Sequence, residues 1–289
     1  MEETKKMIKL SAFSDEAGKE LSCQIAALKR NNISLTELRS VGGKNVKALT
    51  LDEAREISRE LRDNGIELSA LGSPMGKVDI DVELSEYIKE VRHMCELAVI
   101  FGTDKIRMFS FYGAYEKKEK VFEYLREMVK VASEYGVKLC HENEKRIYGD
   151  IAERVMELHD NVEGLAFIYD FANYLQVDEL PESNMKTLYP ITEYFHIKDV
   201  VHETGELVPA GYGDGRIADL INMLDRDTVF TIEPHLKVFD GYGEIDGEEM
   251  CHRFHFTDGN EAFDAAVAAI RKLLTENGYK ETNGGFERI

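Results

Sequence analysis

Eight short runs rich in β-branched and aromatic residues alternate with longer amphipathic stretches along the 289 residues, and this alternation constrains the fold most. The predicted strands are Ile8–Phe13, Ile33–Leu38, Ile66–Leu71, Lys105–Phe109, Val137–Glu142, Leu165–Asp170, Tyr194–Lys198 and Val229–Glu233. Parallel strands need a long crossover between them, usually a helix, and the intervening stretches have that length. The pattern therefore predicts an α/β fold with a parallel sheet.

The number of repeating units favours a closed (β/α)8 TIM barrel over an open, doubly wound sheet. A doubly wound nucleotide-binding fold would carry a glycine-rich fingerprint after its first strand, and this chain reads Phe13-Ser14-Asp15-Glu16-Ala17 there. No linker rich in Pro, Gly or Ser divides the chain. We expect a single domain over residues 1–280, followed by a polar C-terminal tail at 281–289.

Helical periodicity lies between the predicted strands. The expected helices cover residues 19–30, 51–64, 82–101, 117–135, 150–160, 216–224 and 260–276, and a less regular pattern covers 173–188. Thr50 stands three residues before Glu53, which is the spacing of a capping box. We therefore expect one of the helices to begin directly after Thr50.

The composition excludes several classes of protein. With 36 Lys+Arg against 55 Asp+Glu, the net charge of −19 disfavours binding to nucleic acids and to anionic membranes. No stretch of about 18 apolar residues is present, and the first residues lack the apolar core of a secretory signal. The 4 cysteines form no C-x-x-C pair, as in proteins with reduced thiols. We expect a cytoplasmic protein that acts on a small molecule.

Ionisable residues gather at the C-terminal ends of four consecutive predicted strands, where catalytic residues of such barrels lie. These residues are Glu142, Asp170, His196 and Glu233. A lone acid at a strand end is usually solvated or caps a helix, but four residues at matching depth on adjacent strands indicate a shared site. Three carboxylates and one imidazole suit a single divalent ion, namely Mn²⁺, Mg²⁺, Co²⁺ or Zn²⁺.

The chain resembles the sugar phosphate isomerase/epimerase family, the xylose-isomerase-like TIM barrels, over nearly its whole length. The motifs that carry the resemblance are Phe13-Ser14-Asp15-Glu16, Glu142-Asn143, Asp170 followed by Asn173, His196-Ile197-Lys198-Asp199 and Glu233-Pro234. The resemblance implies that Glu142, Asp170, His196 and Glu233 bind one metal ion. It also implies a carbohydrate substrate, and dimers or tetramers are common in the family, so a homo-oligomer is expected.

The resemblance further implies a mechanism in which Glu142 and Glu233 exchange protons with the substrate through an enediolate. Two positions depart from the ketose epimerases: Asn173 stands where a histidine is expected, and His202 where an arginine is expected. Both positions would contact substrate. The departures disfavour a ketose 3-epimerase and leave inosose isomerases and dehydratases open.

Further residues near the predicted mouth of the barrel are candidates for substrate binding. Arg107 could bind an anionic group, Lys198 lies on the strand face of His196 and could neutralise an oxyanion, and His235 could reach the site from a loop. Glu37 and Arg39, at the second predicted strand, could form an ion pair, or Arg39 could meet an anionic substrate. A Gly-rich turn at 210–215 could bind phosphate through its N–H groups. The loops 200–215 and 236–259 are long enough to form a lid or substrate wall.

The sequence thus predicts a metal-dependent isomerase or epimerase acting on a sugar, sugar phosphate or inosose-like hydroxy-ketone. The alternatives are a metal-dependent dehydratase on a similar polyol ketone and a non-catalytic sugar-binding barrel. An abasic-site endonuclease is disfavoured, because it would need many histidine ligands and a basic face, whereas this chain has 8 His and a net charge of −19.

Overall fold

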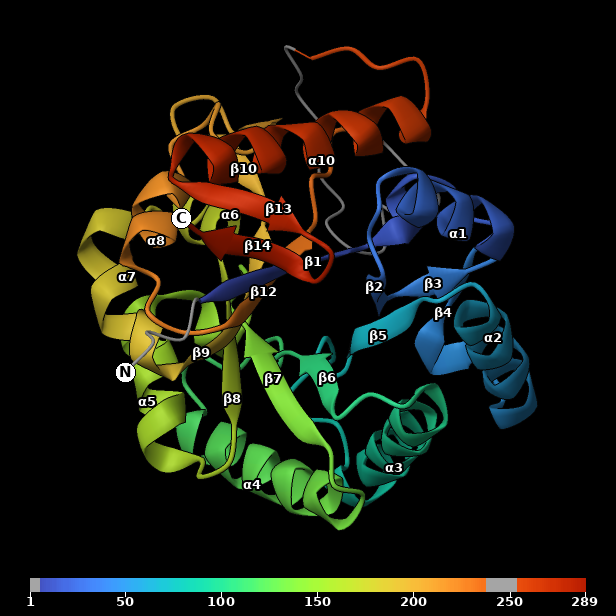
Figure 1. Cartoon of the computed structure of the whole chain (residues 1–289). Helices are drawn as coiled ribbons and strands as arrows, with labels where there is room; N and C mark the ends of the chain where they lie inside the picture. The colour runs from blue at the N-terminus through green and yellow to red at the C-terminus, as the bar shows by residue number, and fades with distance from the viewer. Residues whose placement is uncertain (1–5, 238–253) are drawn as a thin grey trace, which may run out of the picture.

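A curled sheet of eight parallel strands forms the centre of the protein, described here by a computed structural model for residues 6–237 and 254–289 (Figure 1). In chain order the strands are β1 (Met7–Ala12), β2 (Leu35–Leu38), β5 (Glu67–Gly72), β6 (Lys105–Met108), β7 (Lys138–Glu142), β8 (Ala166–Asp170), β9 (Thr192–Ile197) and β12 (Thr228–Ile232). Ladder pairing runs without interruption from β2 through β5, β6, β7, β8, β9 and β12 to β1. Each of the eight predicted strands is confirmed, and so is the α/β barrel class.

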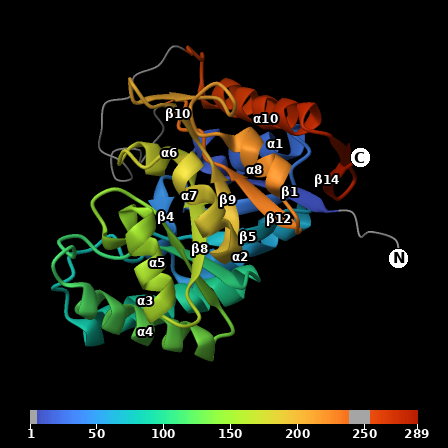
Figure 2. The same ribbon diagram turned by 90° about the vertical axis from the view of Figure 1, so that its left-hand side faces the viewer.

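Helices surround the sheet on its outer face (Figures 1 and 2). They are α1 (Leu21–Arg30), α2 (Leu51–Asp63), α3 (Leu84–Phe101), α4 (Lys118–Glu134), α5 (Ala152–Asn161), α6 (Phe171–Leu175), α7 (Pro181–Leu188), α8 (Ile217–Met223) and α10 (Gly259–Glu276). The predicted capping box is present, because Thr50 Oγ1 accepts from Glu53 N at 3.2 Å and Glu53 Oε2 accepts from Thr50 N at 2.7 Å.

The single helix expected at 173–188 is instead two helices, α6 and α7. Asp178, in the segment between them, has φ of +60°, a conformation that no α-helix accommodates. Pro181 then occupies the first position of α7, where its missing N–H costs no hydrogen bond. Local backbone chemistry therefore divides this stretch.

The C-terminal residues, expected as a polar tail at 281–289, form a β-hairpin. β13 (Tyr279–Thr282) and β14 (Gly285–Arg288) pair with each other, and β14 also pairs antiparallel with β1 through Met7 and Ile8. Phe286 of β14 is buried, which explains why this polar segment does not remain in solvent. Periodicity cannot show this in strands of four residues.

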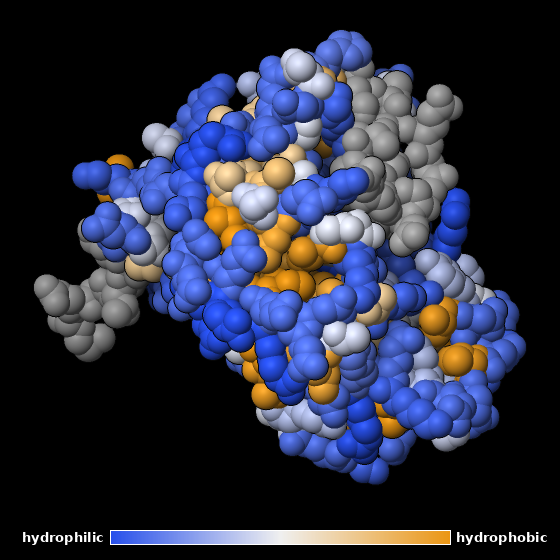
Figure 3. Space-filling model, turned by 90° about the vertical axis from the view of Figure 1, so that its right-hand side faces the viewer, coloured by the Kyte–Doolittle hydropathy of each residue, from blue (hydrophilic) through white to orange (hydrophobic). Residues whose placement is uncertain are grey.

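The hairpin occupies the edge of β1 that faces β2, and no ladder pairs β1 with β2 in the described part of the chain. Toward their C-terminal ends the two strands are joined by a side chain, since Thr36 Oγ1 donates to the Ala12 carbonyl at 3.0 Å. Toward their N-terminal ends they border a hollow of about 670 Å³ that the hairpin also lines. The barrel is thus closed between β1 and β2 at the C-terminal ends of these strands and open between them at the N-terminal ends. On the side that carries α1 and α2, Figure 3 shows an apolar patch surrounded by hydrophilic surface.

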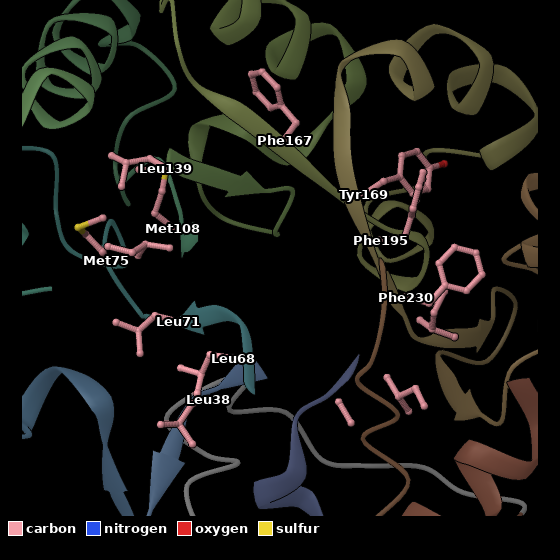
Figure 4. Close-up of a cluster of buried hydrophobic side chains, with 14 of the residues drawn as sticks. Leu38, Leu68, Leu71, Met75, Met108, Leu139, Phe167, Tyr169, Phe195 and Phe230 are labelled. Carbon is pink, nitrogen blue, oxygen red and sulfur yellow. The ribbon is translucent and has the colours of Figure 1, made fainter. Parts of the chain in front are cut away.

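Alternation along the strands sorts side chains between the helices and the barrel interior. Tyr169, Phe195 and Phe230 lie together on neighbouring strands and pack outward (Figure 4), with 5.8 Å between the ring centroids of Phe195 and Phe230. The next residue on each of the first two strands, Asp170 and His196, therefore points inward. Because these aromatic side chains are buried between the sheet and the helices, the ionisable side chains that follow them point into the barrel.

A small apolar cluster inside the barrel lies at the strand positions before these ionisable groups. It contains Ala70, Cys140, Ile168 and Tyr194, all buried. Each of the last three precedes an ionisable residue by two positions on its own strand. Its side chain therefore also points into the barrel, one layer closer to the N-terminal ends of the strands. No helix within the described residues is long and apolar enough to cross a membrane.

Candidate functional site

Glu142, Asp170, His196 and Glu233 converge inside the C-terminal end of the barrel. Each offers one ligand atom, these atoms lie within 4.8 Å of one another, and all four side chains are buried. Glu142, Asp170 and His196 are at or next to the ends of β7, β8 and β9, and Glu233 follows β12 directly. The structure therefore brings together the four residues that were predicted as metal ligands.

The two carboxylates at Asp170 and Glu233 each have one oxygen fixed by the protein and one directed into the group. Asp170 Oδ1 accepts the backbone N–H of Asn173 at 2.8 Å, and its Oδ2 has no hydrogen-bond partner among the described residues. Glu233 Oε1 accepts from Arg39 at 3.0 Å, while its Oε2 lies 3.2 Å from His196 Nδ1. Such oriented, partly unsatisfied oxygens are what a hard cation requires.

His196 is oriented in the same way. Its Nε2 lies 3.1 Å from Glu37 Oε2, and its Nδ1 lies 2.9 Å from Glu142 Oε1. The ring is also packed edge-on against Phe13, at 5.2 Å between centroids. Nδ1 is therefore the nitrogen directed into the group of carboxylates.

The charges in the site do not balance. Six buried carboxylates (Asp15, Glu16, Glu37, Glu142, Asp170 and Glu233) are accompanied by three buried permanent cations (Arg39, Arg107 and Lys198). Burial disfavours protonated His196, but Glu142 and Glu37 raise its pKa well above the usual value, so the metal-free site carries a formal excess of −2. Uncompensated charge in a low-dielectric interior is costly, and a divalent ion bound by neutral His196 would reduce this excess to −1. The balance therefore supports a bound cation.

The pKa values reflect this crowding. Burial raises the pKa of Asp170 to about 7, against the attraction of Lys198. Burial also disfavours ionised Glu142, but His196 and Arg107 outweigh it and lower the pKa of that carboxyl to about 2. Lys198 and His196 likewise hold the pKa of Glu233 well below its usual range despite burial. Both glutamates are therefore carboxylates at neutral pH and can accept a proton.

Together the donor atoms fit a metal ion of the kind predicted. Three carboxylate oxygens and one imidazole nitrogen are the ligands that Mg²⁺, Mn²⁺, Co²⁺ and Zn²⁺ accept. Asp170 Oδ2 has no hydrogen-bond partner among the described residues, and Lys198 Nζ lies 3.2 Å from it. The group could therefore hold one divalent ion without disturbing a hydrogen bond of that oxygen.

Three of the predicted substrate-binding residues lie beside the four predicted metal ligands. Arg107 NH1 is 3.2 Å from Glu142 Oε2 and 3.7 Å from Glu233 Oε1. Lys198 Nζ is 3.2 Å from Asp170 Oδ2, and His235 Nε2 is 3.4 Å from Glu233 Oε1. All are buried, so each could meet a small molecule bound at the ligand group.

The two positions that depart from the ketose epimerases behave differently. Asn173 lies in the site, where its Nδ2 donates to the Asn143 carbonyl at 2.9 Å and approaches Glu142 Oε1 at 3.4 Å. His202 lies outside the group, since its Nε2 pairs with the exposed Asp178 at 3.1 Å. The structure therefore does not bring His202 to the predicted substrate site.

Sequence reasoning missed most of a buried ion-pair network beside Glu233. Arg39 binds Asp15 through two hydrogen bonds of 3.0 Å each and also reaches Glu16 at 3.3 Å. The sequence suggested instead that Arg39 either pairs with Glu37 or meets an anionic substrate. The available signal was the Asp15-Glu16 pair directly after the first strand, at the same end of the barrel as Glu233.

The Gly-rich turn is filled by the protein itself. The Asp199 carboxylate accepts N–H groups from Val200 at 3.0 Å, Gly211 at 2.8 Å, Gly213 at 3.1 Å and Gly215 at 2.9 Å. A Cβ at Gly213 would lie 2.4 Å from Asp199 Oδ1, so this position requires glycine. The N–H groups considered for phosphate therefore already bind a carboxylate.

Of the second long loop, 236–259, which was expected to form a lid or substrate wall, residues 238–253 lie outside the described residues.

Comparisons with known proteins agree with the barrel. The family model described as xylose isomerase-like TIM barrel matches residues 25–281. The structure of L-ribulose 3-epimerase aligns with a TM-score of 0.73 at 13% identity, covering 94% of this chain and 95% of that chain. The probable 3-DHS dehydratase AsbF of Bacillus anthracis aligns with a TM-score of 0.70 at 16% identity, covering 92% and 98%.

A xylose isomerase-like TIM barrel protein from Mycobacterium smegmatis, in complex with magnesium, aligns with a TM-score of 0.65 at 14% identity, covering 94% of this chain and 97% of that one. The search of curated proteins gives no match. At these identities the structural likeness shows a shared fold, while the family model covers most of the chain. This chain belongs to the xylose isomerase-like TIM barrel family.

Proposed function

We propose that the protein is a divalent-metal-dependent isomerase or epimerase of a small carbohydrate or related hydroxy-ketone. The observation that carries the proposal is the buried set of three carboxylates and one imidazole, with ligand atoms within 4.8 Å of one another. Fold relatives include L-ribulose 3-epimerase and a barrel that binds magnesium. The ligand set and the fold support the same chemistry.

Glu142 and Glu233 are the proposed acid/base pair. Both are anionic, and their carboxylates approach the same Nδ1 of His196, at 2.9 Å and 3.2 Å. A substrate bound at the ligand group would therefore lie within reach of two bases. One glutamate accepts a proton from the carbon next to a carbonyl and afterwards releases it to water. The other takes up a proton from water and delivers it to the neighbouring carbon or the opposite face.

Arg107 and Lys198 supply positive charge where the substrate oxygen becomes negative. Arg107 contacts both glutamates and so fixes their separation, whereas Lys198 lies on the Asp170 side of the site. A metal ion held by the four ligands would polarise the substrate carbonyl. These cations would then share the charge of the enediolate.

One observation favours dehydration as a second candidate. Loss of a β-hydroxyl needs a proton donor beside the base, and His235 Nε2 lies 3.4 Å from both Glu233 Oε1 and Glu16 Oε1. A dehydratase is also among the fold relatives. In this reaction Glu233 accepts the carbon-bound proton, and His235 protonates the departing hydroxyl as the C–O bond breaks and water leaves.

An unphosphorylated substrate and a cytoplasmic location complete the proposal. Asp199 already occupies the N–H groups of the Gly-rich turn, which removes the support for a phosphate site there. The three cysteines within the described residues are free thiols, as expected in a reducing compartment.

The test is a hydrogen-exchange screen in D₂O over ketoses, inososes and their phosphates, with metal-free and Mn²⁺-loaded protein. We expect carbon-bound hydrogen to exchange only with Mn²⁺ present. Glu142→Gln and Glu233→Gln should each lose exchange by at least about 100-fold, the contribution typical of a general acid or base. Asp150→Asn, which changes a buried carboxylate paired with Tyr115 and Arg154, is the control and should retain it.

Each outcome separates the candidates. Loss of water from the substrate, seen by NMR and mass, would replace the isomerase by the dehydratase. Failure of the untreated protein to bind any divalent ion would reject both candidates. Exchange at the wild-type rate in Glu233→Gln would remove that residue from the acid/base pair.

A further inference from the structure

A buried chain of hydrogen bonds joins Tyr194, Glu37 and His196 beneath the ligand group. The Tyr194 hydroxyl donates to Glu37 Oε1 at 3.0 Å, and Glu37 Oε2 lies 3.1 Å from His196 Nε2. Glu37 is 1% exposed and His196 is fully buried. The proposed acid/base chemistry uses neither Glu37 nor Tyr194, although Glu37 contacts the Nε2 side of His196, a predicted metal ligand, and Tyr194 contacts Glu37.

Glu37 reaches His196 from another part of the barrel, because β2 and β9 are not neighbours in the sheet. Each oxygen of its carboxylate has one partner, so the group has little freedom to rotate. Burial of a carboxylate is costly, and an apolar side chain would pack here without that cost. The placement of a charge at this position therefore points to a role in orienting the imidazole.

Two irregularities in the parallel ladder lie next to Glu37, the partner of His196 Nε2, and next to Tyr194, the partner of Glu37. Pairing of β2 with β5 shifts between Thr36 and Glu37, and pairing of β8 with β9 omits Glu193, the residue before Tyr194. Bulges are rare in parallel ladders, and they often redirect a side chain next to an active site. Both shifts fall where Glu37 and Tyr194 are presented to the interior.

We propose that Glu37 is a positioning residue that accepts the Nε2–H of His196 and thereby makes Nδ1 the metal-binding nitrogen, with Tyr194 holding Glu37 in place. A histidine that binds metal through one nitrogen carries its hydrogen on the other, and the partner of that hydrogen selects the form. Phe13 blocks a tilt of the ring, because it packs edge-on against His196 at 5.2 Å. This inference rests on the metal-binding part of the proposed function.

The experiment measures the metal centre without substrate. Mn²⁺ affinity is determined by calorimetry for the full chain and for Glu37→Gln, Tyr194→Phe and the control Asp150→Asn. The control also changes a buried carboxylate that accepts from a tyrosine, since Tyr115 donates to Asp150 Oδ2 at 2.6 Å. We expect affinity to fall about 10- to 100-fold in Glu37→Gln, less in Tyr194→Phe, and not in the control.

The second readout is the nitrogen NMR spectrum of His196 in the Mg²⁺-loaded protein, assigned by comparison with His196→Gln. We expect hydrogen on Nε2 and metal at Nδ1 in the wild type, with the Nε2–H signal shifted in Glu37→Gln. A structural role alone would lower thermal stability without moving this signal.

The outcomes distinguish this inference from the proposed function. If the wild type binds no divalent ion, the proposed function fails and this inference fails with it. If the wild type binds Mn²⁺ and folded Glu37→Gln binds it equally well, only the role of Glu37 is overturned. If Glu37→Gln does not fold, a hydrogen on Nδ1 in the wild type overturns the inference, and a hydrogen on Nε2 supports it.

Discussion

Replacing Asp199 by asparagine should unfold the turn that follows it, because one carboxylate satisfies four backbone N–H groups. Its Oδ1 accepts from Val200 and Gly215, and its Oδ2 accepts from Gly211 and Gly213. Asparagine has nearly the same shape but keeps only one acceptor. Whichever way the amide turns, an NH₂ group faces two N–H donors.

The size of the effect follows from these contacts. Two hydrogen bonds to a charged acceptor are lost, each contributing about 1.5–3 kcal/mol, so Asp199→Asn should lower the free energy of unfolding by roughly 3–6 kcal/mol. At about 2 °C per kcal/mol for a chain of this size, the melting temperature should fall by roughly 6–12 °C.

Urea unfolding and amide hydrogen exchange at Gly211, Gly213 and Gly215 test this together. The control is Asp214→Asn, whose exposed carboxylate accepts one N–H, from His202 at 2.9 Å, and which should stay within about 0.5 kcal/mol of the wild type. A loss below about 1 kcal/mol in Asp199→Asn, with the glycine amides still protected, would refute the reasoning.

Three further predictions address pH, packing and metal. The pKa of Glu53 is lowered to about 2 by Lys44 and by the capping box, so its stabilisation is present above pH 4.5 and is lost as the pH falls toward 2. Glu53→Gln should therefore be less stable than the wild type in urea at pH 7, with the difference closing toward pH 2. Phe195→Ala removes a fully buried ring and should cost about 3–5 kcal/mol of unfolding free energy, against a smaller loss for Phe195→Leu. Mn²⁺ at 100 times its dissociation constant should stabilise the protein by about 2.7 kcal/mol in a thermal melt, a gain that chelation or Asp170→Asn abolishes.

Much of the fold was predictable because its strands are buried on both faces and stand out as apolar runs. The convergence of the four predicted metal ligands was predictable for a related reason. Once Phe195 is recognised as part of a buried strand, barrel geometry places its neighbour His196 inside at the C-terminal end, with no side-chain coordinates required. The roles of these four residues as ligands stay predictions.

The features that could not be predicted from the sequence depend on contacts between strands that are far apart in the chain. Arg39 was interpreted as a partner of Glu37 or of substrate, because two residues on one strand face look like neighbours. In the barrel, Arg39 reaches Asp15 while Glu37 reaches His196. The hairpin after residue 278 was missed because its strands are short and polar, and its stability comes from Phe286 and from pairing with β1.

We expect the pairing of β14 with β1 to protect the protein from aggregation as well. Without the hairpin, Met7 and Ile8 would present unpaired N–H and C=O groups at a sheet edge, next to a gap that β2 does not close. Exposed edges of this kind accept strands from other molecules and begin aggregation. Truncation after Gly278 should therefore yield a chain that aggregates at concentrations where the full chain stays monodisperse. In this view the last eleven residues serve to cover the exposed edge of β1.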